Sequence, residues 1–124
     1  MKKILIVEDQ SDIRRLLRAT LEDEGRELRE AFDADAGWLQ VLEWRPDLVL
    51  LDIMMPGSID GLQLCEHIKG DAATRATKVV LVSARGHRND LGIGRDAGAD
   101  DYLSKPFSPL RLIEIVERLS RPGS

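Results

Sequence analysis

The length, composition and charge of the chain restrict what kind of protein it can be. Its 124 residues suffice for one good hydrophobic core but not for two ordinary ones. Apolar residues make up 43% and charged residues 32%, which is typical of a folded globular domain and excludes a disordered chain. The 18 basic and 22 acidic residues leave a net charge of −4, which argues against nonspecific nucleic-acid binding and against a polybasic membrane anchor.

The single cysteine and the short apolar runs bear on location. Cys65 has no second cysteine with which to form an internal disulfide, so a disulfide-stapled secreted fold is excluded. The apolar run after Met1 ends at Val7, which is too short for a signal peptide, and no stretch approaches the ~18 apolar residues of a membrane span. We therefore expect a cytoplasmic protein.

Five segments are typical of β-strands. Ile4–Val7, Leu48–Leu51 and Val79–Val82 are continuously apolar, as expected for strands that are buried on both faces of a parallel sheet. Arg26–Ala31 and Asp101–Ser104 mix polar and apolar residues, which suits the two edges of the sheet.

Helical patterns lie between these strands. In the first, we take Ser11 as the cap and Gly25 as the residue just past the end. In the second, Trp38 is expected in the core and Trp44 at a partly exposed helix end. Mainly apolar residues recur at helical spacing in four sets: Ile13, Leu16, Leu17, Thr20 and Leu21; Trp38, Val41 and Leu42; Leu62, Cys65 and Ile68; and Leu112, Ile115, Val116 and Leu119.

The alternation of strands and helices predicts an α/β fold. We expect a doubly wound, flavodoxin-like, five-stranded parallel sheet in a three-layer αβα arrangement. Three central strands and two edge strands fit the order 2-1-3-4-5, whose switch point lies between the first and third strands. The domain is expected to span residues 1–120, and residues 121–124 read as a linker or terminal tail.

Polar residues follow the predicted strands at their carboxyl ends, where ligands of such sheets bind. Glu8 and Asp9 follow the first strand, Asp52 the third, Ser83 the fourth and Lys105 the fifth. Three crowded carboxylates repel one another unless a cation joins them, and oxygen ligands with room for water suit Mg²⁺. A hydroxyl and an ammonium group beside such a metal form a cradle for an anion such as a phosphoryl group.

Acidic residues near strands can also have purely structural roles. A single Asp after a strand is usually a helix cap or turn residue, and Asp9 alone fits that role. Asp47 precedes the third strand, and Asp100 and Asp101 open the fifth, so we expect all three at the opposite end of the sheet, in solvent. Four strands that end in Asp, Asp, Ser and Lys are much harder to explain by coincidence.

The chain resembles a receiver domain of the response regulators of two-component signalling, with a fold similar to chemotaxis regulators. The resemblance runs from about Lys2 to Leu119. It is carried by the segments Ile6-Val7-Glu8-Asp9, Pro46-Asp47-Leu48-Val49-Leu50-Leu51-Asp52-Ile53-Met54-Met55-Pro56-Gly57, Ser83-Ala84-Arg85 and Ala97-Gly98-Ala99-Asp100-Asp101-Tyr102-Leu103-Ser104-Lys105-Pro106-Phe107.

The resemblance implies a role for each matched position. It places the phosphoacceptor at Asp52 and expects a cis peptide bond between Lys105 and Pro106. The other implied roles are Mg²⁺ binding by Glu8 (through water), Asp9, Asp52 and the backbone carbonyl of Met54; phosphoryl binding by Ser83, Ala84 and Lys105; and switching by Ser83 and Tyr102.

The same resemblance implies partners. A sensor histidine kinase would donate the phosphoryl group from a phosphohistidine, and a face built from the fourth helix, fifth strand and fifth helix would report the change to an output domain or protein. A homodimer on phosphorylation is one such output. We expect no direct nucleic-acid binding, no membrane contact and no turnover of an external substrate by this domain.

Two local features of the sequence bear on the expected switch and on the acceptor loop. Gly92 and Gly94 fall in the expected fourth helix, where each costs about 1 kcal/mol relative to alanine. They either loosen this helix as part of the switch or let it pack closely on the sheet. The loop after the acceptor is one residue longer than the family pattern, because both Ser58 and Ile59 precede Asp60-Gly61.

Rival functions remain open from the sequence alone. A Mg²⁺-dependent phosphohydrolase with an aspartyl nucleophile usually carries a second Asp two residues later, where this chain has Met54. A pseudo-receiver that only binds is disfavoured by the complete set of rim residues. The chain fits either a stand-alone receiver or the amino-terminal piece of a longer regulator.

Overall fold

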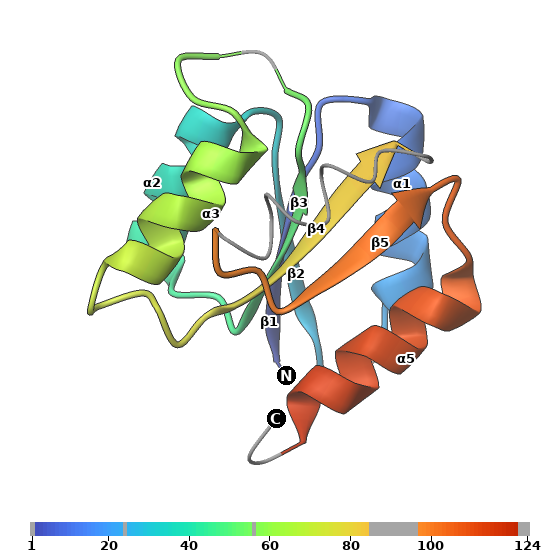
Figure 1. Cartoon of the computed structure of the whole chain (residues 1–124). Helices are drawn as coiled ribbons and strands as arrows, with labels where there is room; N and C mark the ends of the chain where they lie inside the picture. The colour runs from blue at the N-terminus through green and yellow to red at the C-terminus, as the bar shows by residue number, and fades with distance from the viewer. Residues whose placement is uncertain (1, 24, 56, 85–96, 122–124) are drawn as a thin grey trace.

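The computed structural model describes residues 2–23, 25–55, 57–84 and 97–121, which form a parallel sheet with helices on both faces (Figure 1). The strands lie in the order β2-β1-β3-β4-β5, and every neighbouring pair is parallel. The predicted sheet, its order and its two edge strands are therefore confirmed. The strands are β1 (Lys3–Val7), β2 (Glu27–Ala31), β3 (Leu48–Asp52), β4 (Lys78–Ala84) and β5 (Asp101–Lys105).

The described helices make the outer two layers of the predicted three-layer arrangement. On one face lie α1 (Ser11–Leu21) and α5 (Pro109–Ser120), and on the other lie α2 (Ala34–Trp44) and α3 (Gly61–Gly70) (Figure 1). The expected fourth helix, with Gly92 and Gly94, falls outside the described residues, so the expectation about its looseness stays untested.

The hydrophobic core consists of two clusters, one on each face of the sheet. Successive side chains of a strand point to opposite faces, so each central strand contributes to both clusters and reads as a continuous apolar run. On the α1 and α5 side, the strands contribute Ile4, Ile6, Leu48, Leu50, Val80, Val82 and Leu103. On the α2 and α3 side, they contribute Leu5, Val7, Ala31, Val49, Leu51, Val79 and Leu81.

The two ends of α1 differ from the sequence prediction. The N-cap residue is Gln10, not Ser11, and its side chain makes no capping hydrogen bond. Because only residues 8–10 separate β1 from α1, Ser11 already lies inside the helix. The C-cap is Glu22, and Gly25, with φ of +86°, lies in the loop beyond it.

The exposure of the two tryptophans also differs from the prediction. Trp44 is the last residue of α2 but is buried, whereas Trp38 is half-buried and packs against the core cluster on the α2 and α3 side, with its ring centre 5.6 Å from that of His67. The Trp44 ring is covered by side chains of β1 and β2, with Lys3 Nζ 5.6 Å and the Arg29 guanidinium carbon 4.7 Å from its centroid. Its burial therefore depends on strands that are remote in sequence.

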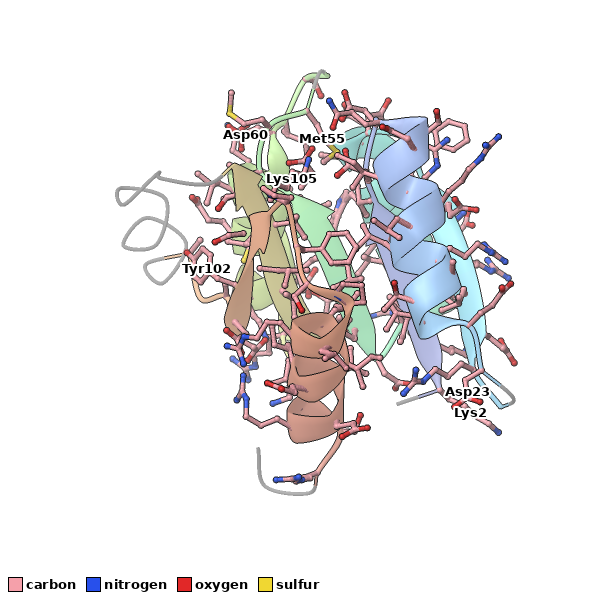
Figure 2. The ribbon with its side chains drawn as sticks, turned by 90° about the vertical axis from the view of Figure 1, so that its right-hand side faces the viewer. Lys2, Asp23, Met55, Asp60, Tyr102 and Lys105 are labelled. Carbon is pink, nitrogen blue, oxygen red and sulfur yellow. The ribbon has the colours of Figure 1, made fainter. Side chains whose placement is uncertain are left out.

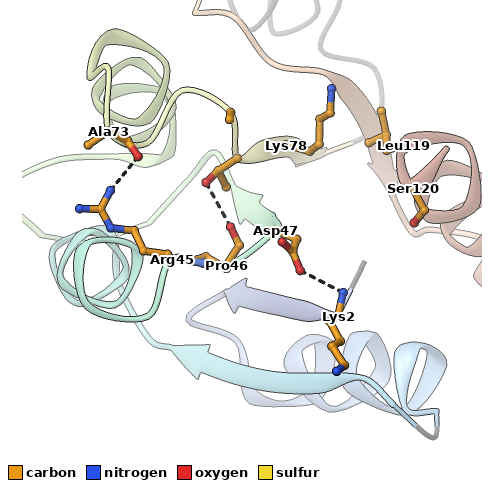
Figure 3. A pocket seen from close by; sticks show the side chains of 10 residues that line it. Lys2, Arg45, Pro46, Asp47, Ala73, Lys78, Leu119 and Ser120 are labelled. Atoms are coloured by element: carbon orange, nitrogen blue, oxygen red, sulfur yellow. Dashed lines mark hydrogen bonds between the residues drawn. The ribbon is translucent and has the colours of Figure 1, made fainter. Parts of the chain in front are cut away.

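A broad hollow of about 790 Å³ opens at the amino end of the sheet (Figure 3). Its polar groups largely bond to one another: Arg45 donates to the carbonyl of Ala73, and the Asp47 carboxylate accepts the backbone N–H groups of Lys2 and Lys3. This is the end opposite to the switch-point rim, so its size alone does not make it the functional site. Within the described residues, no helix is both long and apolar enough to cross a membrane.

Gly61 allows α3 to approach the end of β3 closely. A Cβ atom on Gly61 would lie 2.0 Å from the backbone oxygen of Asp52, whereas one on Gly70, at the other end of the same helix, would meet nothing within 4 Å. We predict that Gly61→Ala lowers the free energy of unfolding by on the order of 3 kcal/mol through overpacking. Gly70→Ala is the matched control and should cause no loss. Urea midpoints measure both; equal midpoints for the two variants contradict the prediction.

Candidate functional site

Three carboxylates meet at the carboxyl end of β1 and β3. Glu8 follows β1 directly and Asp52 ends the neighbouring strand β3, with Val7 paired to Leu51. One carboxylate oxygen of Glu8, one of Asp9 and one of Asp52 all lie within 4.8 Å of one another. Glu8 and Asp52 are buried and Asp9 is exposed, so the group is open to solvent on one side only.

Lys105 reaches this group from the end of β5. Its Nζ lies 2.9 Å from Glu8 Oε1 and 3.2 Å from Asp52 Oδ2. Figure 2 shows Lys105 at the upper end of the sheet. The peptide bond from Lys105 to Pro106 is cis. The structure thus brings together four of the residues that the sequence analysis selected.

Backbone N–H groups hold two of the carboxylates in place. Gln10 donates its N–H to Glu8 Oε2 at 3.2 Å, and Met54 donates its N–H to Asp52 Oδ1 at 3.2 Å. Met54 itself is an exposed side chain beside the group. Each buried carboxylate therefore has one oxygen bonded to the following turn and one facing Lys105.

Burial and like charge act on the protonation of Glu8. The pKa of Glu8 is raised to about 7, mainly by desolvation and also by the neighbouring Asp52, while Lys105 and the Gln10 N–H oppose the rise. Burial alone would lower the pKa of Lys105, but Glu8 and Asp52 outweigh it and raise that pKa. Two buried carboxylates and one ammonium leave the group short of positive charge.

The chemistry of the group fits a small hard cation. Glu8 Oε1 is buried, and its ion pair with the Lys105 ammonium is 2.9 Å long. Asp9, Gln10, Asp52, Met54 and Lys105 line a hollow of about 240 Å³ at this place. Three carboxylates with a single ammonium group, beside an open hollow, are suitable ligands for a cation that also keeps water.

Ser83 and Ala84 lie in the last part of β4 rather than after it. Ser83 is buried, and it follows Val82, the residue paired with Asp52. The backbone of Ala84 is paired with Lys105. Arg85 falls outside the described residues.

Tyr102 lies three residues before Lys105 in β5. It is half-buried and packs against the core cluster on the α2 and α3 side. Figure 2 shows its side chain at the outer edge of the sheet, away from Lys105.

The longer loop after β3 is tied to α2. Ser58 donates its backbone N–H to Asp35 Oδ2 at 3.0 Å and its hydroxyl to Asp35 Oδ1 at 2.5 Å, and these two bonds lower the pKa of Asp35. Gly57 has φ of +126°, and a Cβ there would lie 2.8 Å from Asp35 Oδ2. Asp60, at the end of the loop, is the N-cap of α3 and forms a capping box with Gln63. The additional residue is thus accommodated by a contact with α2.

Asp47, Asp100 and Asp101 lie at the amino end of the sheet, as the sequence analysis expected. Their carboxylates are not surrounded by solvent alone but bind other groups of the protein. Asp47 binds backbone N–H groups at the amino end of the sheet. Asp100 accepts the Val79 N–H and pairs with Lys69 at 2.8 Å, and Asp101 pairs with Arg118. These carboxylates join neighbouring elements and are not part of the candidate site.

Comparison with known proteins identifies relatives along nearly the whole chain. The family model of the response regulator receiver domain matches residues 4–117. The phosphate regulon transcriptional regulatory protein PhoB of Escherichia coli is 42% identical over 120 residues, which is 97% of this chain and 52% of PhoB. The transcriptional regulatory protein ResD of Bacillus subtilis is 42% identical over 122 residues, which is 98% of this chain and 49% of ResD.

The chain is also similar to a solved structure of a receiver domain. The crystal structure of the receiver domain of NtrX from Brucella abortus has a TM-score of 0.85 at 40% identity, covering 94% of this chain and 96% of that one. The chain spans about half the length of the curated relatives it matches.

The raised pKa of Glu8 makes the stability of the metal-free protein depend on pH. The folded protein keeps a proton on Glu8 up to about pH 7, whereas the unfolded chain loses it near the ordinary value of 4.5. The folded state therefore binds more protons in this interval, and stability falls as pH rises through it. Glu8→Gln cannot ionise, and between pH 5 and 8 it should lose less stability than the wild type by on the order of 2 kcal/mol.

Urea unfolding at both pH values in a chelating buffer measures this difference. The matched control is Glu66→Gln on the exposed surface of α3, which should follow the wild type. If Glu8→Gln loses as much stability as the wild type over the same interval, Glu8 does not titrate as described.

Proposed function

Because the chain belongs to the response-regulator receiver domain family, whose general function is to accept a phosphoryl group, we propose that Asp52 is the phosphoryl acceptor of this protein. The observation that carries the proposal is the pairing of a buried Asp52 at the end of β3 with Lys105 Nζ at 3.2 Å. Asp52 also belongs to the group of three convergent carboxylates.

The proposed cofactor is Mg²⁺. Asp9, Asp52 and the backbone carbonyl of Met54 would hold it directly, and Glu8 would hold it through water. The convergence of one oxygen each from Glu8, Asp9 and Asp52 to within 4.8 Å of one another supports this assignment. When bound, Mg²⁺ would supply positive charge to the oxygens of the transferring phosphoryl group.

In the proposed transfer, an Asp52 carboxylate oxygen attacks the phosphorus of a phosphohistidine on a sensor histidine kinase. The new O–P bond forms as the N–P bond breaks, and the imidazole nitrogen leaves and takes up a proton. Ser83, the Ala84 backbone and Lys105 would bind the phosphoryl oxygens. Such transfer depends on positioning and charge stabilisation, because there is little other covalent chemistry for the protein to perform.

The proposed switch runs from Ser83 to Tyr102. The acyl phosphate would draw the Ser83 hydroxyl toward it, and Tyr102 would turn into the space that opens. The half-buried position of Tyr102 in β5 supports this role. The face that would report the change is built from β5, α5 and the helix expected in residues 88–97, which lies mostly outside the described residues.

The proposed partners follow from this switch. The chain covers about half of its curated relatives, two of which are named as transcriptional regulatory proteins, so we propose that an output domain or protein reads the reporting face. We expect the exchange with the kinase to occur in the cytoplasm. The exposed Met54, at the position where phosphohydrolases of similar topology carry a second Asp, supports a receiver without turnover of an external substrate.

Phosphorylation of Asp52 is tested by incubating the chain with Mg²⁺ and a small phosphodonor such as acetyl phosphate. We predict that the wild type gains one phosphoryl group by intact-protein mass spectrometry and that Asp52→Asn gains none, because an amide oxygen is too poor a nucleophile. Asp47→Asn is the matched control: it lies at the other end of β3, and its amide oxygen can still accept the Lys2 and Lys3 N–H groups. Equal labelling of wild type and Asp52→Asn defeats the assignment.

A second measurement tests the output. Beryllofluoride, a mimic of the acyl phosphate, should convert the chain from monomer to dimer in size-exclusion chromatography with Mg²⁺ present. The exposed Leu110 and the ion pair between Asp101 and Arg118 lie on the β5 and α5 part of the proposed face. An unchanged elution volume with saturating beryllofluoride rules out the homodimer and leaves a separate partner as the reader.

A further inference from the structure

Arg14 on α1 contacts the backbone of the acidic turn, whereas Lys105 contacts the Glu8 carboxylate. Its Nη1 donates to the carbonyl oxygen of Glu8 at 2.9 Å and lies 3.4 Å from the carbonyl oxygen of Asp9. Both carbonyls belong to the turn that carries the two carboxylates. We propose that Arg14 is a positioning residue of the metal site, which holds this turn in the conformation that presents Glu8 and Asp9 to the cation.

The guanidinium is held on three sides. Its Nε donates to Glu30 Oε1 at 3.1 Å, and its carbon lies 4.3 Å from the centre of the Phe32 ring. The Arg14 side chain is only 15% exposed. An arginine can make these contacts at once because its fork of donors is planar and its flat face stacks on an aromatic ring. Glu30 in turn accepts from Arg18, so the position of the group is determined by both α1 and β2.

Several polar groups of the turn are held by hydrogen bonds. The Glu8 N–H donates to the Ala31 carbonyl at 3.1 Å, which extends the pairing of β1 with β2. The Glu8 carboxylate accepts the Gln10 N–H, and the two carbonyls accept from Arg14. Without Arg14, the Glu8 and Asp9 peptide groups could rotate with water as their partner, and the carboxylates would move with them.

Arg14 differs in kind from Lys105 because it bonds to carbonyls and not to the site carboxylates. Lys105 lies within 3.2 Å of two carboxylate oxygens and so competes with a cation for them. The hydrogen bonds of Arg14 to the two carbonyls and to Glu30 leave the Glu8 and Asp9 carboxylates available to the cation. Partners of this kind, one shell away from a metal, commonly change metal affinity by about 10–100-fold.

This inference rests on the proposed metal-binding function and is tested by Mg²⁺ affinity, measured by titration calorimetry on the whole chain. We expect Arg14→Gln to weaken Mg²⁺ binding by about ten-fold. Arg15→Gln, which changes the neighbouring exposed arginine, is the matched control. It carries the same loss of charge and should stay within about two-fold of the wild type if position, and not charge, is the cause.

A second readout needs no metal. Amide hydrogen exchange of Gln10, whose N–H bonds to Glu8, should become faster in metal-free Arg14→Gln and stay unchanged in Arg15→Gln. Urea midpoints of all variants separate this local effect from a general loss of stability. Should Arg14→Gln fold poorly, Arg14→Lys replaces it, since one ammonium cannot bond to Glu30 and to both carbonyls in the same plane; we expect an intermediate loss of affinity.

The outcomes separate the two proposals. A wild-type chain that binds no Mg²⁺ at millimolar concentration overturns the proposed metal site and, with it, this inference. A wild type that binds Mg²⁺, together with an Arg14→Gln variant that keeps wild-type affinity, leaves the metal site standing and overturns the role of Arg14. An equal loss of affinity in Arg15→Gln also overturns it, because net charge would then be the cause.

Discussion

Two buried carboxylates share one ammonium group at the carboxyl end of the sheet, and this imbalance of charge governs the site. Glu8 and Asp52 are almost inaccessible to water, and Lys105 lies within about 3 Å of both. Burial of an unbalanced negative charge is costly, which is why the pKa of Glu8 rises to about 7. This cost lowers the stability of the metal-free protein. The same charge imbalance means that the site is stabilised when a cation, and then an anion, binds to it.

The parallel sheet makes this crowding unavoidable. Strands β1 and β3 are neighbours although α1, β2 and α2 separate them in sequence, so the residues that follow them meet at one rim. Lys105 comes from β5, two strands away from β3, and its long side chain spans the distance. On the outer side, α1 brings Arg14 to the backbone of the same turn. The rim is therefore held by elements from both ends of the chain. A local change in any of these elements would alter the geometry of the rim.

Different parts of the structure were predictable to different degrees, and the differences have physical causes. The central strands were readable because full burial on both faces demands apolar residues at every position, as in Leu48–Leu51. The prediction of Ser11 as the cap is wrong, because a cap is decided by the backbone conformation where the β1–α1 loop ends. The prediction of a partly exposed Trp44 is wrong, because Lys3 and Arg29 on other strands cover its ring. No local pattern marks Arg14 or the bond between Ser58 and Asp35.

The sequence by itself determined the fold class, the strand order and the family, since apolar periodicity and the residues after each strand are local properties of the chain. It also selected Glu8, Asp9, Asp52 and Lys105, because parallel strands bring their carboxyl ends to one edge. Only the tertiary structure decided the distances among these groups, the raised pKa of Glu8, and the contacts of Arg14 and Ser58. Those properties depend on desolvation and on bonds between residues far apart in sequence, which exist only once the helices have packed against the sheet.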